Sequence, residues 1–170
     1  MQSAEVTNWP ERLALTALTI LFALTMFSLM RIGWRNKLKV QRQIVSPFDI
    51  PADFVALRSY AGRYLPSTAA GAWLTRIAVH GLGVPSSCEV QIGTDGLAFV
   101  REGAPSFYVP FSDVIATRSD RAIAGRAYEK DGIAVLTWRL GDVEIDTGFR
   151  ASSTSDHISF LAEELGAQNA

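Results

Sequence analysis

Cysteine and histidine are scarce in this 170-residue sequence, and their scarcity bounds its chemistry. Cys88 is the only cysteine, so the chain can form no internal disulfide and no thiolate metal cage. A domain in the cytoplasm fits that composition. His80 and His157 are the only histidines, and the sequence links neither of them to a nucleophile.

Motifs that carry catalysis or phosphate binding are missing as well. The Gly-x-Ser-x-Gly motif of serine hydrolases is absent, and residues 81–83 lack both the spacing of a phosphate loop and a following Walker-type lysine. Asp142, Glu144 and Asp146 are interpreted as a solvated acidic turn and strand face, with a weak cation site or acid-base pair as the alternative. We therefore predict no enzyme, no catalytic residue, no metal site and no cofactor.

The sequence does contain one long apolar run, Leu13–Met30, with no charge, Gly or Pro. At about 1.5 Å rise per residue this run spans roughly 27 Å as a helix, close to the hydrocarbon thickness of a bilayer. Trp9 and Trp34 flank it, where indole rings settle at membrane interfaces. Its Thr and Ser hydroxyls can bond back to the i−4 carbonyl and are tolerated. We predict a transmembrane helix over residues 12–34.

Two other interpretations of this run are possible. A cleaved signal peptide needs a basic start, a shorter apolar core and a small-x-small cleavage site. The first twelve residues instead contain Glu5, Glu11 and only one cation, Arg12, and no such cleavage site follows the run. A buried helix of a soluble fold is the second alternative. We favour an uncleaved anchor.

A basic segment follows the run directly. It contains five cations and no anion: Arg31, Arg35, Lys37, Lys39 and Arg42. The positive-inside rule places such a segment in the cytoplasm. We therefore predict a single-pass protein of the plasma (inner) membrane, with residues 1–11 outside and the C-terminal part in the cytoplasm.

The basic segment is also a candidate lipid site. If the helix continues past the run, Arg31, Arg35, Lys39 and Arg42 lie within an arc of about 80°. They could then contact anionic lipid headgroups at roughly 1 kcal/mol each, or they could only set topology. Residues 43–170 carry ten Lys or Arg and fifteen Asp or Glu, so we expect no nucleic acid partner, which would need a clustered positive surface.

The remaining chain predicts a mainly-β domain. We assign residues 35–55 to a basic collar and linker and residues 56–170 to the domain. Short β patterns are predicted at residues 88–92, 97–101, 107–110, 114–118, 133–140 and 143–149. An amphipathic helix should then begin with Ser155 as its N-cap and present Ile158, Leu161, Ala162 and Leu165. This helix is expected to plug an open end of a small barrel or bent sheet.

The arrangement resembles the pleckstrin-homology-like (PH-like) fold, with about seven antiparallel strands in a small barrel or bent sheet capped by a C-terminal helix. The segments 62–65 (GRYL), 72–83 (AWLTRIAVHGLG), 101–105 (REGAP), 137–142 (TWRLGD) and 146–150 (DTGFR) look like those of small actinobacterial single-pass membrane proteins with a cytoplasmic PH-like domain. Members are often loosely labelled export or transporter proteins, and the resemblance implies no assigned reaction. Phosphoinositide-binding PH domains carry a basic cluster after their first strand, where this chain has only Arg76 and His80.

Together these patterns favour a membrane-anchored cytoplasmic binding or scaffolding module that recruits a protein partner to the inner membrane. The alternative is a small accessory subunit of a membrane transporter or enzyme complex. The segment 71–87 has glycines, apolar residues and little charge, and is the predicted contact surface. Its weak partner-binding candidates are Trp73, His80, Leu82 and Val84. Core packing remains open for Trp73, and a structural role remains open for His80.

Overall fold

The chain folds into two compact units, residues 1–40 and residues 41–170. The structure is a computed structural model that describes residues 9–41, 43–153 and 155–160, with the side chains of 37–40 outside the description. Each unit is considered by itself below.

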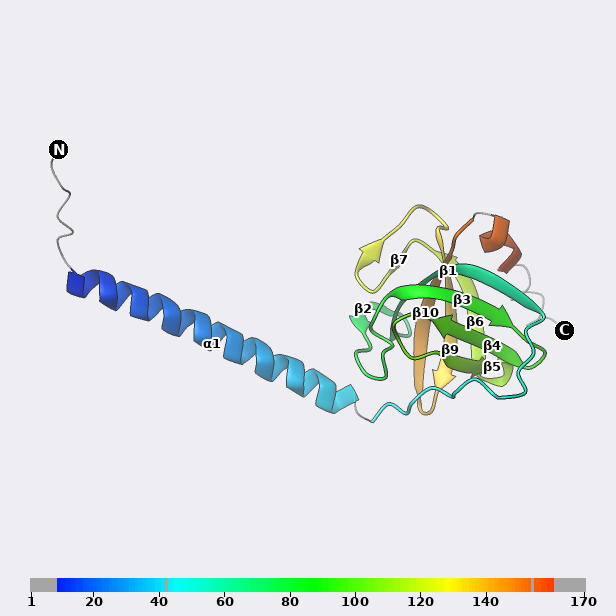
Figure 1. Cartoon of the computed structure of the whole chain (residues 1–170), viewed down its shortest axis with the longest axis horizontal. Helices are drawn as coiled ribbons and strands as arrows, with labels where there is room; N and C mark the ends of the chain where they lie inside the picture. Colours follow the sequence, from blue (N-terminus) through cyan, green and yellow to red (C-terminus); the bar gives the residue numbers. More distant parts are fainter. Residues whose placement is uncertain (1–8, 42, 154, 161–170) are drawn as a thin grey trace. The chain divides into compact units, whose positions relative to one another are not determined.

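The first unit consists of helix α1 (Trp9–Gln41), drawn in blue in Figure 1. Within the described residues, one stretch is long and apolar enough to cross a membrane: Trp9–Asn36, with a mean hydropathy of 2.2. Its hydroxyls behave as expected, since Thr16, Thr19, Thr25 and Ser28 each donate to the carbonyl four residues earlier at 2.8 Å. This pairing removes unsatisfied donors from an apolar helix surface, so α1 is a candidate membrane anchor.

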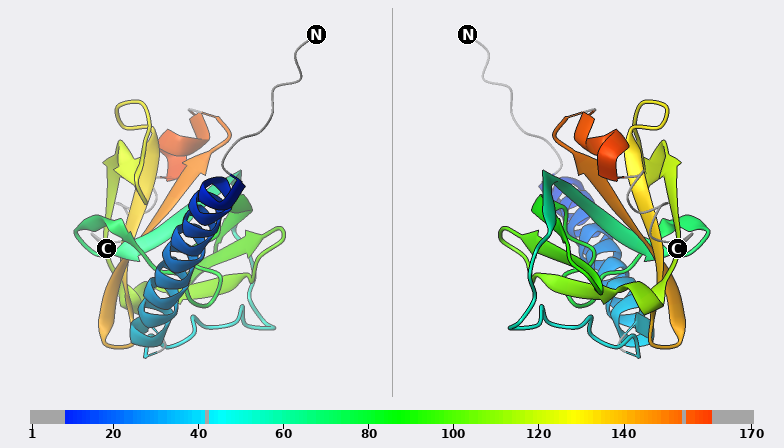
Figure 2. Two further views of the ribbon diagram at one scale, coloured as in Figure 1. Left: turned by 90° about the vertical axis from the view of Figure 1, so that its left-hand side faces the viewer. Right: turned by 90° about the vertical axis from the view of Figure 1, so that its right-hand side faces the viewer.

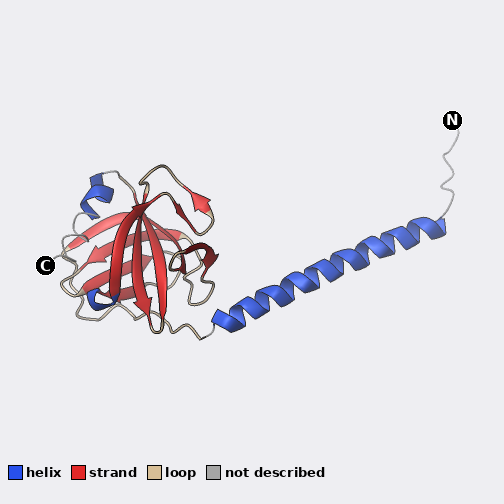
Figure 3. Ribbon diagram, turned by 180° about the vertical axis from the view of Figure 1, so that it is seen from behind, coloured by secondary structure: helices blue, strands red, loops and turns tan. Residues whose placement is uncertain are grey.

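The second unit is built on an antiparallel sheet that curls into a half-barrel (Figure 3). Its strands are β1 (Arg58–Ala69), β3 (Ser86–Ile92), β4 (Gly96–Arg101), β5 (Phe107–Pro110), β6 (Val114–Asp120), β9 (Ile133–Leu140) and β10 (Val143–Ala151). They lie in the order β5-β4-β3-β1-β10-β9-β6. The 3-10 turn η1 (Phe111–Asp113) joins β5 to β6. The predicted bent antiparallel sheet is confirmed, with its six predicted strands in place.

Three further strands lie off this path. β2 (Ala72–Arg76) pairs with β1 alone, while β7 (Ala122–Ile123) and β8 (Arg126–Ala127) form a separate hairpin. The backbone N–H of Gly125, at the hairpin tip, donates to the carbonyl of Trp73 at 3.2 Å. β2 and the β7–β8 hairpin are therefore tied together beside the sheet.

The hairpin covers part of the outer face of the sheet. Ile123 packs there with Leu65 and Val135 in a small second core. A Cβ on Gly148 would lie 2.9 Å from the Leu65 Cβ, so only glycine fits at this position of β10. The prediction of a wet face along β10 is therefore wrong between Asp146 and Gly148, which are both buried.

The main core lies inside the curl and is rich in aromatic residues. Phe107 stacks on Phe99 at 4.7 Å and on Trp138 at 6.0 Å between ring centroids. The Trp138 indole donates to Thr147 Oγ1 at 2.9 Å, which places its polar edge on a partner inside the core. Trp138 is fully buried.

Residues 155–160 form a short helix, drawn orange-red beside β10 in Figure 2. The residue that enters the core is Phe160, 1% exposed, whereas Ile158 is 62% exposed. Leu161, Ala162 and Leu165 lie outside the described residues. Ser153 Oγ accepts a hydrogen bond from the backbone amide of Asp156. The predicted cap at Ser155 and the predicted buried Ile158 are therefore both wrong.

The segment before β1 is bonded to the domain. The Gln41 side chain accepts from the Ala78 amide at 2.7 Å and donates to the Arg76 carbonyl at 3.0 Å. Further along, Phe48 forms an isolated antiparallel bridge with Tyr108, whose amide donates to the Phe48 carbonyl at 2.8 Å. The linker thus follows the domain surface through defined hydrogen bonds.

Candidate binding cleft

An open cleft of about 380 Å³ lies where the β1–β2 turn, β2, β6, β7 and β10 meet. Its lining combines one aromatic residue, two arginines, two aspartates and two small residues: Trp73, Arg118, Arg121, Asp120, Asp146, Gly71 and Ala122. The small residues leave room between the walls. Such a mixture of an aromatic wall and convergent polar groups is typical of a binding site.

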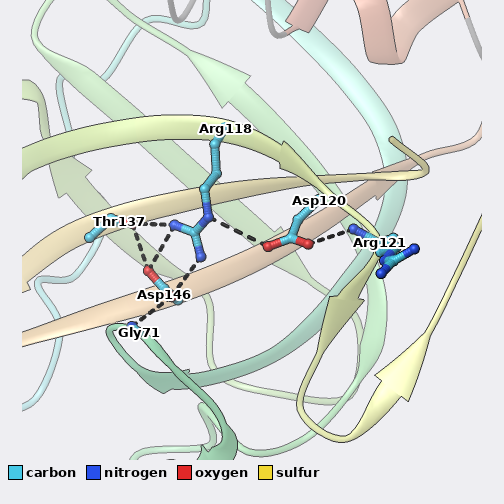
Figure 4. A network of polar contacts seen from close by, with 6 residues as sticks. All are labelled: Gly71, Arg118, Asp120, Arg121, Thr137 and Asp146. Carbon is cyan, nitrogen blue, oxygen red and sulfur yellow. Dashed lines mark hydrogen bonds and ion pairs between the residues drawn. The ribbon is translucent and has the colours of Figure 1, made fainter. Parts of the chain in front are cut away.

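Asp146 on β10 is the fixed centre of the cleft (Figure 4). It is 3% exposed and accepts from Thr137 Oγ1 at 2.6 Å and from Arg118 Nη2 at 2.8 Å. The Gly71 amide adds a bond of 3.3 Å. Burial acts to raise the pKa of Asp146, but the bonds from Arg118 and Thr137 outweigh it and hold that pKa below its usual range.

Arg118 on β6 connects this buried carboxylate to the surface. Its Nη2 pairs with Asp146 at 2.8 Å, and its Nε lies 3.5 Å from Asp120 Oδ2. The hydrogen bond to Asp146 is the main reason that the pKa of Arg118 is raised. Asp120 in turn accepts from the backbone amide of Arg121 at 2.7 Å. The guanidinium of Arg118 is thus committed to two carboxylates.

Arg121 and Trp73 stand at the rim. The Arg121 side chain is exposed, and among the described residues no carboxylate pairs with its guanidinium. Trp73 on β2 is 47% exposed. At its rim the cleft therefore has an exposed guanidinium, without a carboxylate partner among the described residues, and an exposed indole. The polar groups of its floor are hydrogen-bonded to one another.

A second arginine site, at Arg101 on β4, fixes the loop that follows β2. Arg101 is 6% exposed, and its Nη2 donates to the carbonyls of Gly81 at 3.1 Å and Val84 at 2.5 Å. Its guanidinium carbon lies 3.8 Å from the ring centroid of Tyr64, a cation–π contact. Burial lowers the pKa of Arg101 and raises that of Tyr64 to about 12.

This loop contains three of the predicted partner-binding residues. Leu82 is fully buried, so the prediction that it is exposed for docking is wrong; the bonds from Arg101 hold the loop against the core. Val84 is 50% exposed. His80 is exposed and adopts a positive φ of 54°, with Nε2 2.7 Å from the Ile44 carbonyl, which ties it to the linker.

The predicted lipid-binding residues fall partly outside the description. Arg31 and Arg35 are exposed on α1. The side chain of Lys39 and the whole of Arg42 lie outside the described residues. Lipid contact by these four residues stays a prediction.

Two observations bear on metal and thiol chemistry in the part of the chain that the structure describes. Within them, His, Cys, Asp and Glu form no group of three or more that could hold a metal ion. Burial raises the pKa of Cys88 to about 12, which suppresses the reactive thiolate. Sequence reasoning missed the clustering of Arg118, Arg121 and Asp146, because no local motif marks residues brought together by a distant hairpin.

Comparison with protein families identifies the domain. A family model described as "Bacterial PH domain-like" matches residues 43–164. The crystal structure of the C-terminal domain of an unknown protein from Leishmania infantum is similar at 11% identity, covering 79% of this chain and 96% of that chain with a TM-score of 0.42. No curated protein matches the sequence.

Proposed function

Because the chain belongs to the bacterial PH domain-like family, we propose that it is a membrane-anchored module whose cytoplasmic PH-like domain recruits a protein partner to the inner membrane. PH-like domains are typically non-catalytic, and binding is accordingly the proposed role. The candidate anchor is α1, which would confine the domain to the bilayer surface.

The observation that carries this proposal is the exposure of β2. Trp73 is 47% and Leu74 66% exposed, on a strand that pairs with β1 at only two positions. Large apolar side chains that are exposed on a short strand are of the kind found at protein interfaces. The strand adds little to the barrel, so its apolar residues are better explained by contact with a partner.

The proposed orientation rests on charge. Arg31 and Arg35 directly follow the apolar run, and positive residues at the end of a span favour the cytoplasmic side. The same residues, with Lys39 and Arg42, are proposed to contact anionic headgroups. Cytoplasmic placement also fits the single reduced thiol, Cys88.

Site-specific photo-crosslinking in cells tests the recruitment. A photoreactive phenylalanine analogue at Leu74 of the full chain should capture a discrete protein band after illumination. The matched control is Val100, which is 36% exposed on β4. Equal labelling from both positions, or none from Leu74, would contradict recruitment through β2.

The accessory-subunit alternative predicts a different result. It places the partner contact on α1, where apolar residues such as Phe22 and Phe27 are exposed. A partner that co-purifies with a chain ending after the span, and that crosslinks from Phe22 but not from Leu74, would favour this alternative.

A further inference from the structure

We propose that the cleft of Trp73 and Arg121 receives an acidic segment of the partner protein, with one carboxylate on Arg121 and an adjacent apolar side chain on Trp73. This inference rests on the proposed recruitment of a protein and specifies its surface and chemistry. The occupant is a peptide segment in which an acidic and an apolar residue lie close together.

The first argument is the order of charges along the cleft floor. A continuous series of contacts runs from the Gly71 amide to Asp146, then to Arg118, to Asp120 and to the backbone of Arg121 (Figure 4). Negative and positive groups alternate along it. Arg121 joins the series through its amide and not through its guanidinium, so the series ends in an uncompensated cation. A partner carboxylate would continue the alternation.

The second argument is rigidity. Asp146 is held by four hydrogen bonds, from Thr137, the Gly71 amide and two nitrogens of Arg118. The floor is therefore organised before any partner arrives. A preorganised site loses less conformational entropy on binding, so a short segment can be held.

The third argument sets the division of roles. An exposed ion pair at Arg121 contributes little by itself, because water and salt screen it. Aromatic side chains dominate interface energetics, and Trp73, which is 47% exposed, still has about half of its surface to bury against a partner. Affinity should therefore come from Trp73 and charge preference from Arg121, which requires both residue types in the partner.

Charge also argues against a lipid phosphate or a nucleic acid in this cleft. Asp120 and Asp146 lie in the floor, where they would repel a multiply charged group that approached Arg118. A single carboxylate on a mobile chain can reach Arg121 without facing the floor.

Peptide selection on the full chain tests the inference. Random dodecapeptides displayed on phage are selected against the protein in phosphatidylcholine nanodiscs, and the enriched peptides are titrated. We expect Asp or Glu within about three positions of an aromatic or aliphatic residue. Trp73→Ala should weaken binding about tenfold or more and Arg121→Gln about three- to tenfold. Arg121→Lys should retain most of the affinity, and added salt should weaken the wild type more than Arg121→Gln.

Arg63→Gln is the matched control, because it removes one exposed cation from β1 outside the cleft and should change affinity less than twofold. Enriched peptides without acidic residues, no enrichment, or equal binding by Arg121→Gln would each overturn the inference. Displacement of the peptide by nanodiscs containing phosphatidylglycerol would assign the cleft to lipid and also overturn it. If Leu74 still crosslinks a protein in those cases, recruitment stands and only the cleft assignment fails.

Discussion

Arg101 and Arg118 both lie on the same sheet, but their guanidinium groups have partners of different charge. Arg101 is buried, and its partners are neutral: Ser86, the Tyr64 ring and backbone carbonyls. Arg118 has a side chain that is 41% exposed and holds two carboxylates. Neutral, buried contacts are insensitive to salt, whereas contacts to carboxylates respond to salt and pH. The contacts of the loop of residues 78–85 should therefore be independent of salt and pH, whereas those in the cleft should weaken with added salt or at low pH.

Arg101→Ala should give the largest effect. The substitution leaves Ser86 and the carbonyls of Gly81 and Val84 without their donor, and we expect the free energy of unfolding to fall by about 3 kcal/mol. Urea titration of the full chain in mild detergent, followed by tryptophan fluorescence, measures it. Arg63→Ala, at an exposed position of β1, is the control and should change stability by about 0.5 kcal/mol or less. If Arg101→Ala lowers the free energy of unfolding by less than about 1 kcal/mol, the loop does not depend on the hydrogen bonds of Arg101.

Cys88, which faces Arg101 across the β3–β4 pair, should react slowly with thiol reagents in the folded protein. The thiolate is the reactive form, and burial raises the pKa of Cys88 to about 12. At pH 8 we expect a maleimide to label the native protein at least about 100-fold more slowly than the urea-unfolded chain. Mass spectrometry of timed samples gives both rates. Native labelling within about tenfold of the unfolded rate would mean that this region opens readily.

On the Arg118 side, Asp146→Asn should lower the free energy of unfolding by about 2 kcal/mol, because it leaves a partly buried guanidinium without its main counter-ion. The pKa of Asp146 is lower in the folded protein, so its stabilisation is present above the unfolded pKa and is lost as pH falls through the folded pKa. Between about pH 5 and pH 3 the wild type should lose more stability than Asp146→Asn. Parallel pH profiles from thermal melts would contradict this role for Asp146.

Asp120→Asn should have the smallest effect. The Asp120 contact to Arg118 is 3.5 Å long and exposed, and such pairs contribute less than about 0.5 kcal/mol. Thermal melts of the variant and the wild type should therefore nearly coincide. Salt at about 0.5 M, well above physiological ionic strength, should remove the remaining difference in melting temperature. A loss as large as that of Asp146→Asn would erase the distinction between the fixed and the exposed carboxylate.

Local pattern was sufficient for α1 and for six strands of this fold, but not for β1, β2 and the β7–β8 hairpin. The apolar run predicted the helix that became α1, and the β patterns at residues 133–140 and 143–149 became β9 and β10. Period-two alternation also placed the strands. These signals lie within a few residues of the element they specify, which is why one sequence reveals them.

Most of the errors involve contacts between distant segments; the exception is the helix cap, where Ser153 and not Ser155 accepts from the Asp156 amide. Asp146 was predicted to be solvated because the sequence of β10 does not reveal that the β7–β8 hairpin covers its outer face. Leu82 was predicted to be exposed because its burial depends on Arg101, nineteen positions further along. Ile158 was predicted to face the core, but Phe160 is the residue that packs on Tyr60, about a hundred positions away in the sequence. The binding cleft depends on the same long-range packing.

The bridge between Phe48 and Tyr108 has a consequence for crowding on a membrane. β5 is the terminal strand of the sheet, and its unpaired backbone groups could recruit a strand from a neighbouring molecule. The linker bonds the Tyr108 amide and so occupies part of that edge with the protein's own chain. Molecules confined to two dimensions meet far more often than molecules in solution. By covering part of the β5 edge, the linker would reduce edge-to-edge aggregation of molecules that are concentrated at a membrane.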